Sequence, residues 1–165
     1  CVDLSVAEYL TLILKSSTSP SRRALSASAL GACNAMLFIP DLAEALNDSA
    51  KMPRASDVGQ EDRNDFPVRR AASLALRHLG VTVTNPDPVR EFEYQVDSAS
   101  AVKAIEPLLN SSENGISMQA IHAIRRIGDE TARSTLRSFA VEIQDDMSKE
   151  DLVEAANAAL ADISE

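Results

Sequence analysis

The pattern of apolar residues at positions 67–80 returns, in the same order, at positions 115–128. The two stretches read PVRRAASLALRHLG and GISMQAIHAIRRIG, and each ends at a glycine. Their shared apolar positions follow one face of an α-helix, and glycine readily adopts the left-handed conformation that closes a helix. The equivalent pairs are Val68 and Ile116, Ala72 and Ala120, Ala75 and Ala123, Leu76 and Ile124, and Leu79 and Ile127. The sequence therefore predicts one type of helix, used at least twice.

Two further stretches follow the same pattern. Residues 148–164 place Leu152, Ala156, Ala159, Leu160 and Ile163 at the equivalent positions. Residues 20–33 form a fainter copy that begins with Pro20, which suits the first turn of a helix. Within this copy Cys33 shares a helical face with Leu25, Ala29 and Ala32, and we expect that face to be buried.

Each of these helices has a companion with its own apolar face. The companions occupy residues 4–15, 38–48, 98–112 and 129–144, and Pro107 should kink or end the third of them. The chain is thus predicted to be all-α, with about eight helices. Helix pairs are expected at 20–48, 67–111 and 115–144.

This alternation resembles the HEAT repeats, which belong to the armadillo-like α-solenoids. The resemblance covers most of residues 4–163 and is strongest at 67–80 and 115–143, but it is absent from 49–66 and 81–97. It implies a right-handed α-solenoid in which each helix pair packs on the next, forming a single domain over residues 1–165. Because the motif consists of packing positions, it is specific for a fold and weak for a function.

Residues 81–97 change the period from 3.6 to 2. Val81 and Val83 alternate with threonines, and Phe92, Tyr94 and Val96 alternate with polar residues. The NPDP sequence between them opposes helix and favours a turn. We therefore expect a small β-hairpin at 81–97, inserted between the two helices of one repeat. An irregular loop folded back on the helices is the alternative.

Composition excludes several classes of function. The net charge is −9, most of it carried by residues 129–165, and the chain has no Trp. Nucleic-acid binding depends on cationic contacts to phosphates, so a nucleic-acid partner is not expected. No apolar run is long enough for a membrane span. His78 and His122 lack a second histidine or a cysteine at ligand spacing, so we expect no metal and no cofactor, and regard both as surface histidines.

Charged and aromatic residues are the candidates for contact with a partner. Arg22–Arg23 and Arg69–Arg70 lie near helix starts, where we expect them to bond acidic groups of the adjacent turn. A second group, Arg125, Arg126, Arg133 and Arg137, flanks one turn between two helices. Arg133 and Arg137 share a helix face, so the group could receive an acidic or phosphorylated peptide, although the acidic end of the chain could equally neutralise it. The predicted partner-binding residues are Asp41, Glu44, Arg90, Phe92, Tyr94, Arg133 and Arg137.

Three functions remain open at this point. We favour a non-enzymatic interaction scaffold that binds a protein or peptide on its concave face or through the 81–97 insert. A bilin lyase or isomerase-like tetrapyrrole-binding protein is one alternative, because such proteins also resemble HEAT arrays. A structural segment of a larger multidomain protein is the other. A cytoplasmic location is favoured, with a bacterial lipoprotein or periplasmic protein as the alternative because the sequence starts at Cys1.

Overall fold

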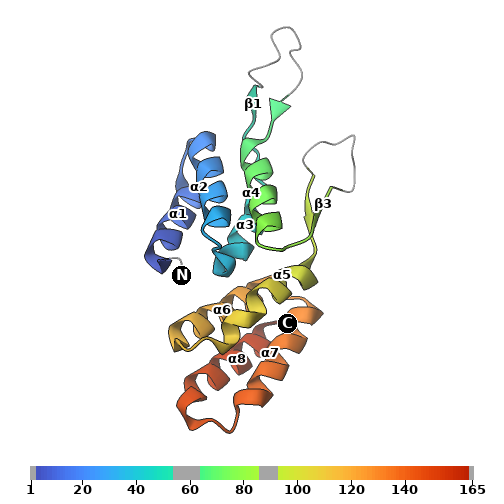
Figure 1. The fold of residues 1–165 in the computed structure, drawn as a ribbon. Helices are drawn as coiled ribbons and strands as arrows, with labels where there is room; N and C mark the ends of the chain where they lie inside the picture. The colour runs from blue at the N-terminus through green and yellow to red at the C-terminus, as the bar shows by residue number, and fades with distance from the viewer. Residues whose placement is uncertain (1–2, 54–63, 86–92, 164–165) are drawn as a thin grey trace. The chain divides into compact units, whose positions relative to one another are not determined.

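A computed structural model describes residues 3–53, 64–85 and 93–163 of the chain. Contacts divide it into two compact units, Cys1–Val96 and Asp97–Glu165. The described residues contain eight α-helices and two short antiparallel strand pairs (Figure 1). The predicted all-α class and the predicted number of helices are therefore confirmed.

The first unit contains four helices: α1 (Leu4–Ser16), α2 (Pro20–Ala32), α3 (Ile39–Ala45) and α4 (Pro67–His78). Side-chain caps fix the starts of two of them, because Asp3 accepts a hydrogen bond from the Ser5 amide and Ser19 accepts one from the Arg22 amide. Pro20 occupies the first turn of α2, as expected. A 3₁₀ turn, Met36–Phe38, leads into α3.

The helices α1, α2 and α4 lie side by side in the first unit (Figure 1). Between α2 and α4 the backbones come very close, since a Cβ atom added to Gly31 would lie 2.8 Å from the Cα of Ala75. The buried face of α2 consists of Ser26, Ala27, Leu30 and Gly31. Small residues on this face let α4 approach.

The structure buries a different face of α2 from the one that the sequence predicted, so that prediction is wrong. Leu25 is 70% exposed, Ala32 is exposed, and Cys33 and Ala29 are only half-buried. The alignment of α2 with the other copies selected the face of Leu25, and not the face that carries Leu30. The packing against α4 instead uses the side that carries Gly31, because only that side allows the close approach.

The predicted hairpin is present at its base. Strand β3 (Val83–Thr84) pairs with β4 (Gln95–Val96) in antiparallel register, with Val83 opposite Val96. Val81 and Val83 are buried and Thr82 and Thr84 exposed, so the predicted alternation is confirmed there. A second pair, β1 (Met52–Pro53) with β2 (Asn64–Asp65), was not predicted.

The second unit holds α5 (Ser98–Ile105), α6 (Asn114–Ile127), α7 (Glu130–Ile143) and α8 (Glu150–Ile163). As predicted, the α-helix before Pro107 ends, and the chain continues as a 3₁₀ helix, Glu106–Asn110. A 3₁₀ turn, Met147–Lys149, precedes α8. Gly128 closes α6 with a φ of 70°, and Gly80 follows α4 with a φ of 84°, so both glycines adopt the expected left-handed conformation.

The matched apolar positions line the interior of each unit. All five are buried on α4, while on α6 and α8 three are buried and two half-buried. Within the first unit α2 packs on both α1 and α4, and α3 packs on α4, whereas α1 and α3 touch only slightly. Within the second unit α6 packs on α8, and α5 on α7. None of the helices in the described residues is both long and apolar enough to cross a membrane.

Candidate binding surface

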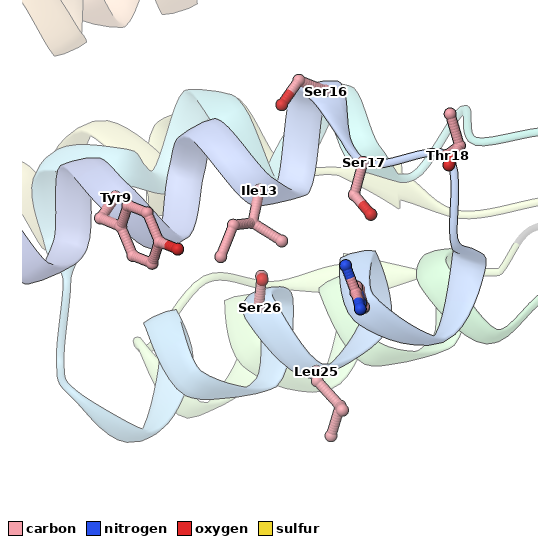
Figure 2. A pocket seen from close by; sticks show the side chains of 8 residues that line it. Tyr9, Ile13, Ser16, Ser17, Thr18, Leu25 and Ser26 are labelled. Carbon is pink, nitrogen blue, oxygen red and sulfur yellow. The ribbon is translucent and has the colours of Figure 1, made fainter.

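An open groove of about 620 Å³ runs between α1 and α2. Figure 2 shows Ile13 of α1 facing Ser26 of α2 across it, with Tyr9 toward one end and Ser17 toward the other. The lining residues are Tyr9, Ile13, Ser16, Ser17, Thr18, Arg22, Leu25 and Ser26. The groove is therefore apolar at one end and rich in hydroxyl groups at the other.

Large apolar side chains are exposed in the lining of this groove and elsewhere on α1. Tyr9 is 64% exposed, and Val6 and Leu12 of α1 are also exposed. They occur because α1 carries apolar residues nearly all round, whereas only Ala7, Thr11 and Leu14 are buried against the rest of the unit. Exposed apolar side chains that line a groove, as Tyr9 and Leu25 do here, are typical of a site that binds another protein.

Arg22 supplies the charge in the groove. It is the one charged side chain among the described residues that line the groove, and its guanidinium forms no ion pair within the described part of the chain. Arg23, its neighbour, behaves differently. It forms two hydrogen bonds with the Asp48 carboxylate, of 2.8 and 3.0 Å, and donates a third to the Ser17 carbonyl.

Asp48 also connects α2 to α4. Its carbonyl accepts a hydrogen bond from the Arg69 guanidinium, which lies 4.5 Å from the centre of the Phe66 ring. Burial raises the pKa of the Asp48 carboxyl, but hydrogen bonds from Arg23 and the Ala50 amide outweigh it, so the pKa is lowered overall. The expected bond to an acidic group is thus confirmed for Arg23, whereas Arg69 bonds the main-chain carbonyl of Asp48.

Asp41 and Glu44, two predicted contact residues, both pair with Lys15 of α1. The Lys15 ammonium lies 2.6 Å from the Asp41 carboxylate and 3.3 Å from that of Glu44. The hydrogen bond from Lys15 to Asp41 raises the pKa of the lysine. These two ion pairs link α1 to α3. Asp41 is buried and Glu44 exposed, so of the two Glu44 is the accessible carboxylate.

Arg133 and Arg137 lie on α7, where the sequence placed them. Arg133 donates hydrogen bonds to Glu130 at 2.7 Å and to the Ile163 carbonyl at 2.9 Å, at the end of α8. Nearby, Arg125 forms an ion pair of 2.7 Å with Asp162. The C-terminal helix therefore engages two of these arginines, as the neutralising alternative expected, whereas Arg137 is exposed.

The hairpin residues fall partly outside the described part of the chain. Arg90 and Phe92 lie outside the described residues, whereas Tyr94 is described and half-buried. Arg77 holds the base of the hairpin on α4 by donating to the Val83 carbonyl at 3.0 Å. The Val81 amide also donates to the carbonyl of Leu76, so β3 follows directly from the end of α4.

His78 and His122 are both exposed, as predicted. Within the ranges that the structure describes, no cluster of three or more histidine, cysteine or acidic side chains is placed to hold a metal ion. No family model and no curated protein matches this chain.

The α1–α2 groove was not anticipated from the sequence, although one signal was present. Val6, Tyr9, Leu12 and Ile13 lie outside the face of α1 that carries Ala7 and Leu14. A helix that is apolar on more than one face needs more than one packing partner. The additional apolar residues on α1 therefore indicated a second contact surface on this helix.

Proposed function

We propose that this chain is a HEAT-type, right-handed α-solenoid over residues 1–165 that serves as a non-enzymatic scaffold for a protein or peptide partner. The observation that carries the proposal is the open α1–α2 groove with its exposed apolar rim. An open, shallow surface suits the side chains of another polypeptide, whereas small molecules are usually held in enclosed pockets.

The packing inside each unit supports the repeat assignment. Aligned helices contact aligned helices, as in α2 with α4 and α6 with α8, the companions α5 and α7 contact each other, and companions also pack on aligned helices, as α1 does on α2 and α7 on α8. Stacked helix pairs produce this two-layer pattern, because each pair buries its apolar face only against the next pair. The fold alone does not define a function, so the binding role depends on the groove itself.

Leu25 tests the proposal, because it lines the groove and contributes little to the core. Leu25→Ser should strongly reduce capture of partner proteins from extracts of the source cells, compared by quantitative mass spectrometry. Leu74→Ser is the matched control, since Leu74 on α4 is 57% exposed but does not line the groove. Both variants should keep the wild-type melting temperature to within a few degrees.

Equal capture by the wild type and the Leu25→Ser variant would refute the groove as the binding surface. An equal loss in both variants would show that any exposed leucine matters, and would also refute it. Only a selective loss with Leu25→Ser supports the proposal.

A further inference from the structure

A second exposed apolar surface lies in the Asp97–Glu165 unit, at the end of α7 and the turn that follows. Val141 is 60% exposed and Met147 is 93% exposed. Three exposed acidic residues, Glu142, Asp145 and Asp146, lie between them in the sequence. We call residues 141–147 the acidic turn.

The acidic turn presents free negative charge beside its apolar side chains. Asp146 is engaged locally, because its carboxylate accepts hydrogen bonds from the amide and the hydroxyl of Ser148. Glu142 and Asp145 form no ion pair within the described residues. Two carboxylates are therefore available to a partner, together with Val141 and Met147.

The groove between α1 and α2 has the opposite character. It offers apolar contact at Tyr9, Ile13 and Leu25, and its charge is the guanidinium of Arg22, which forms no ion pair with any described residue. In a chain with a net charge of −9, a cationic apolar groove is an exception. Complementary charge beside complementary apolar surface favours the specific pairing of two surfaces.

We propose that the acidic turn of one copy of this chain docks into the α1–α2 groove of a second copy. Met147 enters between Tyr9 and Leu25, and a carboxylate of Glu142 or Asp145 pairs with Arg22. The inference rests on the proposed function, because it requires the groove to be a protein-binding surface, and it names the occupant.

The geometry of such a contact differs from that of a two-fold dimer. Two different surfaces meet, so each copy keeps one free groove and one free acidic turn, and further copies can add head to tail. The contact is small compared with stable interfaces, so we expect a Kd on the order of 0.1 mM. Because the paired charges are exposed, added salt should weaken the association.

Sedimentation equilibrium of the full chain, below and above that Kd, tests the inference. The wild type should form concentration-dependent oligomers larger than a dimer. Arg22→Glu removes the charge of the groove, and Met147→Ser removes the apolar anchor of the turn. Each variant alone should self-associate about tenfold more weakly. Leu74→Ser, outside both surfaces, should associate as the wild type does.

Mixing the two variants gives the decisive result. The Arg22→Glu chain keeps an intact acidic turn, and the Met147→Ser chain keeps an intact groove. Together they should restore a complex of one copy of each, which cannot grow further because its remaining surfaces are both impaired. A mixture that associates no better than either variant alone overturns the inference.

The outcomes separate this inference from the proposed function. A wild type that stays monomeric throughout overturns the inference. If Leu25→Ser still selectively loses partner capture in that case, the groove binds a different protein and the proposed function stands. If the wild type self-associates but Arg22→Glu does not weaken it, the groove is not the docking site, and the inference fails.

Discussion

Gly31 lies where α2 and α4 approach most closely. A methyl group at this position would lie 2.8 Å from both the Cα and the Cβ of Ala75, and the backbone of α4 cannot move aside cheaply. Gly31→Ala should therefore lower the free energy of unfolding by about 1–3 kcal/mol through overpacking. Urea unfolding followed by circular dichroism measures this.

Gly115 provides the matched control for Gly31. It also lies in a helix, α6, but a Cβ atom there would meet nothing within 4 Å. Gly115→Ala should be neutral or stabilise by up to about 1 kcal/mol, because alanine restricts the unfolded chain. Similar destabilisation in both variants would contradict the role given to the α2–α4 contact, because alanine has the higher helix propensity and the site at Gly115 has room for a Cβ atom.

Asp48 should make the stability of the first unit depend on pH. Its pKa in the folded chain is lowered from 3.8, so its contribution is complete above pH 3.8 and is lost as the pH falls below that value through the folded pKa. At neutral pH, Asp48→Asn should reduce the free energy of unfolding by about 2 kcal/mol. The difference from the wild type should shrink as the pH is lowered below 3.8.

Asp162→Asn is the control for this experiment. Asp162 also pairs with an arginine, Arg125, but both side chains are exposed. Exposed ion pairs contribute little, so this variant should change the free energy of unfolding by less than about 1 kcal/mol. A difference between Asp48→Asn and the wild type that stays constant down to acid pH would contradict the role given to the Asp48 carboxylate.

Among the elements, α4 has the clearest division between a buried and an exposed face. Leu76 is fully buried, whereas Leu74, two residues earlier, faces solvent. Leu76→Ala should cost about 2–5 kcal/mol, because it leaves a cavity in the packed interior. Leu74→Ala should stay within about 0.5 kcal/mol of the wild type. Thermal and urea unfolding of both variants measure these two changes in the free energy of unfolding. A difference between the variants that is smaller than expected would contradict the prediction.

The success of sequence reasoning differs from element to element for physical reasons. The positions of α4, α6 and α7 could be predicted because each has one dominant apolar face, and that face determines both the helix and its burial. On α2 the expected face contained Leu25, which is exposed, whereas Leu30 lies on the face that is buried. The close approach at Gly31 depends on α4, which the local pattern of α2 does not contain.

The candidate site was harder to predict than the helices. Its lining comes from α1, α2 and the turn between them, so the groove depends on how the two helices pack against each other. Asp41 looked like a surface carboxylate on the sequence, but Lys15 from a different helix covers it. Pair contacts of this kind depend on tertiary packing, whereas the repeat pattern describes single helices.

The hairpin at 81–97 carries the prediction that its aromatic residues bind a partner. Replacing Phe92 and Tyr94 with serine should abolish partner capture, while helical content and melting temperature stay nearly unchanged. Val83→Ser is the control for stability, because Val83 is buried and the variant should melt earlier. A large drop in melting temperature for the double variant would instead place the aromatic side chains in the core.

At the scale of the whole molecule, each of the two units buries apolar side chains of its own. Leu30, Leu42 and Leu76 are fully buried in Cys1–Val96, and Ile105, Ile124 and Leu136 in Asp97–Glu165. Damage to one interior should therefore spread only partly to the other.

Ile124→Ala tests how far such damage spreads. The variant should lose about 2–5 kcal/mol of local stability. Native-state hydrogen exchange should show a fall of that size in the amide protection of α6, α7 and α8, and a clearly smaller fall in α1, α2 and α4. Leu76→Ala should produce the reverse pattern. An equal loss of protection in all six helices, in both variants, would mean that residues 1–165 unfold as one cooperative domain.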